Sequence, residues 1–188
     1  MTQCSEQEVT RLLPLVSAQR REQALRYKHT FGQYCCLQSY KMLCELLAEW
    51  GRAHPTPYTL HPTPIFLYND YGAPYIEGGP HFSISHCKRG IAVAVSENPI
   101  GIDIESIRSF KPELIRKTMN EDEQLRITSS AIPEVEFIRF WTQKEALLKL
   151  QGTGIIADLH NVLTHSQNVS WTEITHQSPD YICTIANL

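Results

Sequence analysis

The chain has 188 residues, enough for one sizeable domain or for two small ones fused together. Hydrophobic residues make up 42% and charged residues 20% of it, which is ordinary for a soluble globular protein. The net charge of −3 argues against a general nucleic-acid binder, which would carry a basic excess. Residues 1–16 lack the pattern of a signal peptide, and the apolar run at 91–95 is too short to cross a bilayer. We therefore expect a cytoplasmic protein with no nucleic-acid and no membrane partner.

The cysteines form neither a CxxC pair nor a zinc-type spacing with the histidines. In an intracellular protein such residues are mostly reduced and packed as small apolar side chains. We expect this of all six, which are Cys4, Cys35, Cys36, Cys44, Cys87 and Cys183.

The first third of the chain is predicted to be helical. Ser5 and Glu8 have the spacing of a capping box, so a short helix is expected to begin there. Residues 17–30 form a basic, helix-favouring run, and residues 32–50 carry apolar side chains at helical spacing. Four prolines between residues 51 and 64 predict an irregular segment.

The middle and the end of the chain alternate between strands and helices. Short runs rich in β-branched and aromatic residues predict strands at 65–68, 81–85, 90–96, 100–105, 169–174 and 181–185. Helices are predicted at 111–127 and 133–150. This order indicates an α+β protein of two lobes, 1–98 and 99–188, with the seam at Asn98-Pro99.

Two carboxylates lie on one face of the strand predicted at 100–105. Alternate side chains of a strand share a face, so Asp103 and Glu105 project together while the isoleucines between them face the core. Two carboxylates on one face repel each other unless a cation or a shared proton lies between them. A solvated strand face is the alternative, because any half-buried strand shows this alternation.

The helix predicted at 133–150 carries three charged residues near its end. Glu145 and Lys149 are four residues apart and lie together at the edge of an apolar stripe, as an ordinary surface ion pair would. Lys144 falls near the middle of that stripe, where a lysine is costly unless it is paired or extends to water.

Ser85 and His86 stand at the end of the strand predicted at 81–85. A hydroxyl and an imidazole there are suited to contact a phosphate, although a single histidine at a strand end is often structural. A Ser–His nucleophile pair is rejected, because adjacent strand residues point apart and no Gly-x-Ser-x-Gly turn presents the serine.

Taken together in this order, four segments resemble the 4′-phosphopantetheinyl transferase superfamily. They are Phe-Ser-Ile-Ser-His at 82–86, Ile-Gly-Ile-Asp-Ile-Glu at 100–105, Trp-Thr-Gln-Lys-Glu-Ala-Leu-Leu-Lys at 141–149 and Gly-Thr-Gly-Ile at 152–155. The likeness is to the subclass with two fused halves that acts on carrier proteins of peptide and polyketide synthetases. It implies two similar α/β lobes related by a pseudo-twofold, an active site at their interface, and a monomer.

The resemblance implies an enzyme that transfers 4′-phosphopantetheine from coenzyme A to a serine of an acyl or peptidyl carrier protein. The other product is adenosine 3′,5′-bisphosphate. The residues that match the family's magnesium ligands are Asp103, Glu105 and Glu145. Glu145 and Lys149 match catalytic positions. The positions that match contacts to coenzyme A are Arg20, Gly72, Pro74, Ser85, His86 and Lys149.

The sequence departs from the family pattern around the nucleotide. Ala73 stands in place of a usual lysine, Gln23 in place of another, and Cys35 in place of an arginine. Weaker binding of coenzyme A, or compensation by nearby basic residues of the segment 21–28, would follow. A degenerate member that binds coenzyme A or a carrier without catalysis is therefore one alternative, and another Mg²⁺-dependent phosphoryl-transfer enzyme is a second.

A basic run follows the carboxylate strand and is suited to an acidic carrier protein. A solvated helix face explains it equally well. Its members are Arg108, Lys111, Arg116 and Lys117.

Overall fold

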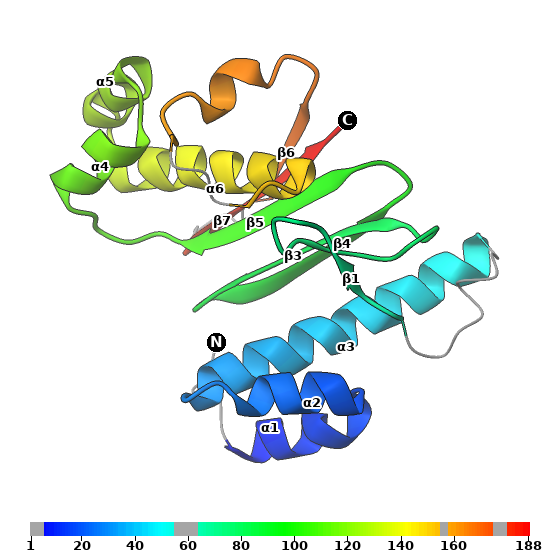
Figure 1. Ribbon diagram of the computed structural model, residues 1–188. Helices are drawn as coiled ribbons and strands as arrows, with labels where there is room; N and C mark the ends of the chain where they lie inside the picture. Colours follow the sequence, from blue (N-terminus) through cyan, green and yellow to red (C-terminus); the bar gives the residue numbers. More distant parts are fainter. Residues whose placement is uncertain (1–5, 55–63, 155–157, 175–179) are drawn as a thin grey trace.

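The computed structural model describes residues 6–54, 64–154, 158–174 and 180–188, apart from the side chain of His165. Helices and antiparallel strands alternate along it, so the predicted α+β class is confirmed (Figure 1). Ser5 of the predicted capping box lies outside the described residues. No helix of the described residues is long and apolar enough to span a membrane.

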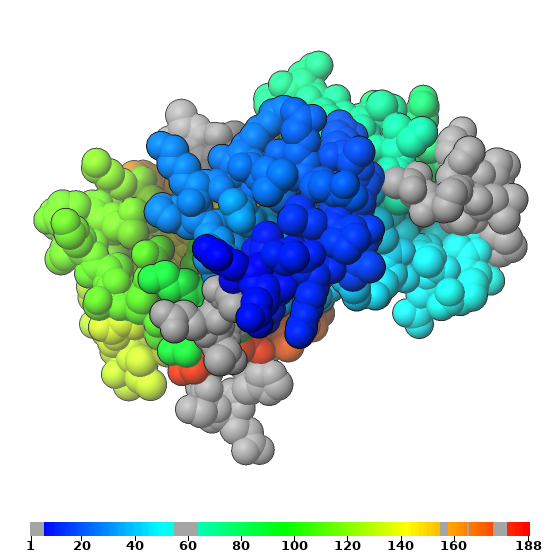
Figure 2. Space-filling model, turned by 90° about the horizontal axis from the view of Figure 1, so that it is seen from below, coloured from blue at the N-terminus to red at the C-terminus, as the bar shows by residue number. Residues whose placement is uncertain are grey.

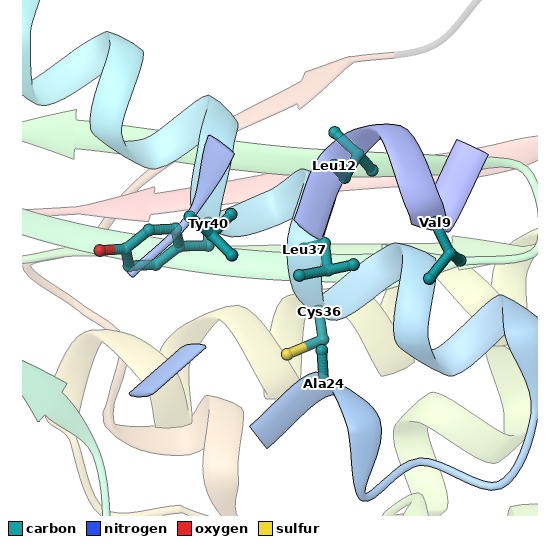
Figure 3. Packing of buried hydrophobic residues seen from close by; sticks show 7 residues of the cluster. Val9, Leu12, Ala24, Cys36, Leu37 and Tyr40 are labelled. Atoms are coloured by element: carbon teal, nitrogen blue, oxygen red, sulfur yellow. The ribbon is translucent and has the colours of Figure 1, made fainter. Parts of the chain in front are cut away.

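Three helices and a short 3-10 turn form the N-terminal part of the chain. They are α1 (Glu6–Leu12), η1 (Leu13–Leu15), α2 (Ala18–Leu25) and α3 (Thr30–Ala53). The basic run 17–30 is split, because Ser17 caps α2 by accepting a hydrogen bond from the Arg20 amide and the helix already ends at Leu25. These helices occupy the middle of the face seen in Figure 2, with other parts of the chain around them, and they share an apolar core (Figure 3). Its labelled members are Val9, Leu12, Ala24, Cys36, Leu37 and Tyr40.

Two β-hairpins follow the long helix α3. The small one pairs β1 (Leu67–Tyr68) with β2 (Pro74–Tyr75), and the larger one pairs β3 (His81–Cys87) with β4 (Gly90–Ser96). The strand expected at 65–68 therefore covers only its last two residues, and β2 was not anticipated. Gly72 has a φ of +80° in the turn between β1 and β2, a backbone conformation that favours glycine.

The C-terminal part forms a three-stranded antiparallel sheet of order β5-β7-β6. Its strands are β5 (Ile100–Ser106), β6 (Ser170–Ile174) and β7 (Tyr181–Asn187), at the places the sequence predicted. Between β5 and β6 come α4 (Pro112–Thr118), α5 (Glu121–Ser129), α6 (Pro133–Gln151) and η2 (Val162–His165).

The prediction of a single helix over 111–127 was wrong. The helix is interrupted at Met119 and Asn120, because Asn120 caps a new helix, α5, with a capping box. Its side chain accepts a hydrogen bond from the Glu123 amide at 2.9 Å, and the Glu123 carboxylate accepts one from the Asn120 amide at 2.9 Å. Helix α6, predicted at 133–150, ends at Gly152 in the left-handed region, with a φ of +66°.

The elements stack in layers, in the order α3, the β3–β4 hairpin, the sheet β5-β7-β6 and α6 (Figure 1). Ile102 and Ile104 of β5 and Cys183 of β7 pack against Cys87 of the hairpin, so the two halves of the chain share a core. The lobe boundary at 98/99 and the pseudo-twofold between the lobes stay predictions.

Candidate functional site

Strand β5 is pressed against helix α6 at Gly101. A Cβ added to Gly101 would lie 1.8 Å from the Ala146 carbonyl oxygen and 2.6 Å from the Leu150 amide nitrogen. By strand alternation Asp103 and Glu105 share the Gly101 face, so both project beneath α6. Asp103 is only 5% exposed. The alternative of a solvated strand face is therefore wrong at Asp103.

Asp103 is held by two side chains from distant parts of the sequence. Ser85 Oγ in β3 and Lys149 Nζ in α6 each donate a hydrogen bond of 2.7 Å to Asp103 Oδ1. Lys149 Nζ also donates to the Ile102 carbonyl at 3.1 Å. Lys149 thus makes its ion pair with Asp103, 46 residues away, and the expected surface pair with Glu145 is not its role. The other carboxylate oxygen, Asp103 Oδ2, is buried and has no hydrogen-bond partner among the described residues.

Two further carboxylates share the electrostatic field of Asp103. Burial raises the pKa of Glu145, and the charges of Asp103 and Glu105 raise it further against the opposing effect of Lys149. Burial and then Asp103 raise the pKa of Glu105, while Arg108 and Lys149 oppose the rise. Three half-buried or buried carboxylates with one adjacent ammonium make a site that favours an additional cation.

His86 follows Ser85 in β3, is exposed, and is close enough to Lys149 and Asp103 to respond to their charges. Partial desolvation of the ring and the positive charge of Lys149 lower its pKa, and Asp103 opposes them, so the imidazole is favoured in its neutral form. Earlier in β3, Ser83 Oγ accepts a hydrogen bond of 3.0 Å from the Ile102 amide, and this bond fixes β3 beside β5. Sequence analysis missed Ser83, although its alternation with Ser85 places both serines on one face of β3.

Lys144 is paired inside the protein. Its Nζ donates to Glu123 Oε2 at 2.6 Å and to the carbonyls of Thr118 and Leu159 at 2.7 Å each. The lysine is 2% exposed, and burial lowers its pKa, which the hydrogen bond and the charge of Glu123 oppose. The pair ties α6 to the start of α5 and leaves Glu145, the next residue, free to face β5. Glu123 was missed, since the partner of a buried lysine 21 residues away has no local signal.

The β1–β2 turn reaches the end of α6. Asn69 Nδ2 donates a hydrogen bond of 2.8 Å to the Gly152 carbonyl, one turn after Lys149. Gly72 and Pro74 flank Ala73 in this hairpin, and Ala73 Cβ would lie 3.9 Å from a Cβ added to Gly152, at the end of the helix that carries Glu145 and Lys149. The sequence had identified the glycines but not the role of Asn69.

Arg20 lies in another environment. Its guanidinium stacks on the rings of Tyr40 and Phe66 at 4.7 and 5.9 Å, and its Nη1 lies 3.8 Å from Cys36 Sγ on α3. Phe66 contacts Phe82 of β3 edge to face at 5.4 Å. Arg20 is thus fixed on the α3 side of the hairpin, and its contacts in the described residues are with that layer.

The donor chemistry of the carboxylate group suits a hard divalent cation. Oxygen ligands are what Mg²⁺ binds, and it usually takes only one or two carboxylates and completes its shell with waters and substrate phosphates. The unpartnered Asp103 Oδ2 is an acceptor that such an ion would satisfy. The described residues contain no group of three acidic, histidine or cysteine side chains that could by itself hold a metal ion, so Asp103, Glu105 and Glu145 do not form a complete ligand set here. An open Mg²⁺ site, which relies on other oxygens, does not need one.

Part of the chain matches a known protein family, and known proteins are similar to most of the chain. The model of the 4′-phosphopantetheinyl transferase superfamily matches residues 99–186, the part that contains Asp103, Glu105, Glu145 and Lys149. The 4′-phosphopantetheinyl transferase ffp of Bacillus subtilis is 28% identical over 96% of this chain and 81% of its own length. Residues 99–186 therefore match the 4′-phosphopantetheinyl transferase superfamily, and the similarity to a transferase of that name extends over 96% of the chain.

Other transferases of that name are similar over different extents. The 4′-phosphopantetheinyl transferase Sfp of Bacillus subtilis strain 168 is 27% identical over 96% of this chain and 81% of its own length. The 4′-phosphopantetheinyl transferase gsp of Aneurinibacillus migulanus is 31% identical over 52% of this chain and 42% of its own length. The similarities to ffp and Sfp cover 96% of this chain, so they extend beyond the segment 99–186 and include the N-terminal helices.

Proposed function

We propose that this chain transfers 4′-phosphopantetheine from coenzyme A to a serine hydroxyl of an apo acyl or peptidyl carrier protein. The observation that carries the proposal is Asp103, held by Ser85 and Lys149 with one buried oxygen unpartnered, beside two carboxylates. The match of residues 99–186 to the superfamily and the similarity to relatives named as 4′-phosphopantetheinyl transferases support the reaction class.

The reaction forms one bond and breaks one. The serine oxygen of the carrier bonds to the β-phosphorus of coenzyme A, and the bond from that phosphorus to the bridging oxygen breaks. Adenosine 3′,5′-bisphosphate leaves with the bridging oxygen, and the serine proton passes to a base. A bound Mg²⁺, held by Asp103, Glu105 and Glu145, would supply positive charge for the pyrophosphate oxygens.

Glu145 is the proposed base, directly or through a water. Burial and the charge of Asp103 raise its pKa, whereas a bound Mg²⁺ would lower it again, so the position of Glu145 among the carboxylates, and not its basicity, supports this role. Lys149 is proposed to stabilise the charge on the leaving phosphate, because its ammonium is fixed by Asp103 and the Ile102 carbonyl. Both side chains lie one turn apart on α6, so one helix presents the base and the cation together.

Ser85 and His86 are proposed to contact the coenzyme A phosphates from β3, and Gly72 and Pro74 to border its nucleotide. The neutral imidazole favoured at His86 offers a hydrogen-bond donor without adding charge. Arg20 is proposed as a further contact, at the α3 side. Because all of these groups come from one chain, we propose that a monomer holds a complete site.

The carrier is proposed to dock beside β5, on a groove of about 450 Å³ next to Phe110 and Leu114. Arg108, Lys111 and Lys117 line the groove, and Arg108 also acts on the carboxyl of Glu105 at the site. An apolar floor with a basic rim is complementary to the acidic helical domain that the family's carriers are expected to be. Reversing the charge of Lys111 or Lys117 is expected to raise the KM for the carrier and leave that for coenzyme A unchanged.

The proposal is tested by incubating the protein with an apo-carrier, coenzyme A and Mg²⁺, and measuring the carrier by mass spectrometry. We expect the carrier to gain the mass of one phosphopantetheine. Glu145→Gln is expected to abolish the gain, while Glu134→Gln, on the first turn of the same helix and roughly 16 Å away, is the matched control.

One alternative function rests on Ala73, which stands where a lysine is usual in the family. In that case the protein binds coenzyme A or a carrier without catalysis. Coenzyme A binding by calorimetry, with no mass gain on any of a panel of carriers, would favour this alternative over the transferase.

A further inference from the structure

The side chain of Asn69 joins the β1–β2 turn to the helix of the catalytic site. Its Oδ1 accepts hydrogen bonds from the amides of Tyr71 at 3.0 Å and Ala73 at 2.9 Å, which fixes the turn. Its Nδ2 donates to the Gly152 carbonyl at 2.8 Å, 83 residues away in the sequence. One amide side chain therefore uses both of its ends, the first within the turn and the second across the two halves of the chain.

The backbone around this contact is built for a close approach. Asn69 also exchanges backbone hydrogen bonds with the turn, from its amide to the Ala73 carbonyl at 3.0 Å and from the Gly72 amide to its own carbonyl at 2.9 Å. Gly152 has a φ of +66°, and a Cβ there would lie 3.2 Å from Asn69 Nδ2 and 3.9 Å from Ala73 Cβ. The turn thus lies directly on the C-cap of α6.

This C-cap is rigidly connected to the catalytic residues. The Gly152 amide donates to the carbonyls of Leu148 and Lys149, so Gly152 continues the last turn of the helix. Lys149 in that turn holds Asp103 at 2.7 Å. A displacement of the β1–β2 turn relative to Gly152 therefore changes its position relative to the carboxylate group.

We infer that Asn69 is a positioning residue that sets the place of the β1–β2 turn relative to Lys149 and Asp103. This inference rests on the proposed function, in which the turn borders the nucleotide and a cation held by the carboxylates would bind the pyrophosphate of coenzyme A. Because position 73 is alanine, the turn has no lysine side chain there that could reach the phosphates. The position of its backbone therefore determines how it contacts the nucleotide. Asn69 acts through the turn and does not itself touch the reacting atoms.

The test separates the two ends of the amide. Asn69→Ala removes both, whereas the double variant Asn69→Asp/Asp70→Asn keeps the acceptor within the turn, removes the donor to Gly152, and leaves the net charge of the turn unchanged. Asp70→Ala, in the same exposed turn, is the control. Initial rates are measured over a range of coenzyme A concentrations at saturating carrier, and amide hydrogen exchange is measured at residues 69–74.

For Asn69→Ala we expect the KM for coenzyme A to rise about five- to tenfold, about the effect of losing the single hydrogen bond to Gly152, with kcat and the KM for the carrier changed less than about twofold. The double variant should show the same rise although its turn amides stay protected from exchange. An unchanged KM in either variant, an equal rise in Asp70→Ala, or a loss of kcat together with thermal stability would overturn the inference. A wild-type protein that transfers nothing would instead overturn the proposed function.

Discussion

Replacing Gly101 by alanine is expected to displace helix α6 from β5, and with it Glu145 and Lys149 from Asp103. The new Cβ would lie 1.8 Å from the Ala146 carbonyl oxygen, 2.6 Å from the Leu150 amide nitrogen and 2.9 Å from the Ala146 carbonyl carbon. All three are helix backbone atoms, so no side chain can rotate away. A normal van der Waals separation requires α6 to move by more than about 1 Å.

The magnitude follows from that displacement. Overpacking a core costs about 1–3 kcal/mol, and we expect the upper end because backbone must move against backbone. For a chain of this length each kcal/mol lowers Tm by about 2–4 °C, so the fall should be about 6–12 °C. Glu145 and Lys149 move with the helix, and a misplacement of about 1 Å is expected to lower kcat by about 100-fold.

Calorimetry and transfer kinetics of Gly101→Ala check both figures. Gly90→Ala is the matched control, because its Cβ would meet the flexible end of the Ile104 side chain at 3.0 Å, which can shift cheaply. A Gly101→Ala protein with the stability and activity of the wild type would refute the packing of α6 on β5 as the origin of the site.

Three further outcomes are expected. Lys144→Met should lower the free energy of unfolding by about 3–5 kcal/mol in chemical denaturation, because it leaves Glu123 buried without its cation. Adding Glu123→Gln, which removes the charge and keeps an acceptor for the Asn120 amide, should recover part of that loss. No recovery in the double variant would show that the pair is not the cause. Burial raises the pKa of the Cys183 thiol to about 11, so in the native protein it should react with iodoacetamide at pH 8 far more slowly than in the unfolded protein. Alkylation at equal rates in the native and unfolded protein would contradict this raised pKa. Because the folded-state pKa lies above the value of about 8.5 of a free thiol, the contribution of Cys183 to stability is complete below about pH 8.5 and is lost as the pH rises towards 11. Chelation by EDTA should stop phosphopantetheine transfer and Mg²⁺ should restore it, whereas transfer that survives chelation would argue against a metal held by Asp103.

The sequence predicted the parts of the fold that local pattern determines. The strands at Ile100–Ser106 and Tyr181–Asn187 and the helix at Pro133–Gln151 were found, because alternation and helical periodicity are properties of neighbouring residues. The break at Asn120 was missed although Asn120 and Glu123 have the spacing of a capping box, since the apolar periodicity continues through it.

The sequence predicted which residues form the candidate site but not which contacts they make with one another. Ordered motifs identified Asp103, Glu145 and Lys149, yet each alone fitted a solvated strand face or a surface ion pair. Which partner Lys149 takes depends on how closely α6 approaches β5, and that depends on Gly101, a glycine within a strand pattern and thus a signal for close backbone approach that was not used. The contacts of Asn69 and of Lys144 span 83 and 21 residues, so no local pattern records them.

A quenched reaction of wild-type protein, apo-carrier, coenzyme A and Mg²⁺, with both products measured in one sample, distinguishes group transfer from hydrolysis. Group transfer predicts that holo-carrier and adenosine 3′,5′-bisphosphate appear in a one-to-one ratio and that neither forms without the carrier. Release of adenosine 3′,5′-bisphosphate without holo-carrier, as from a phosphodiester hydrolase, or the absence of both products, would contradict it.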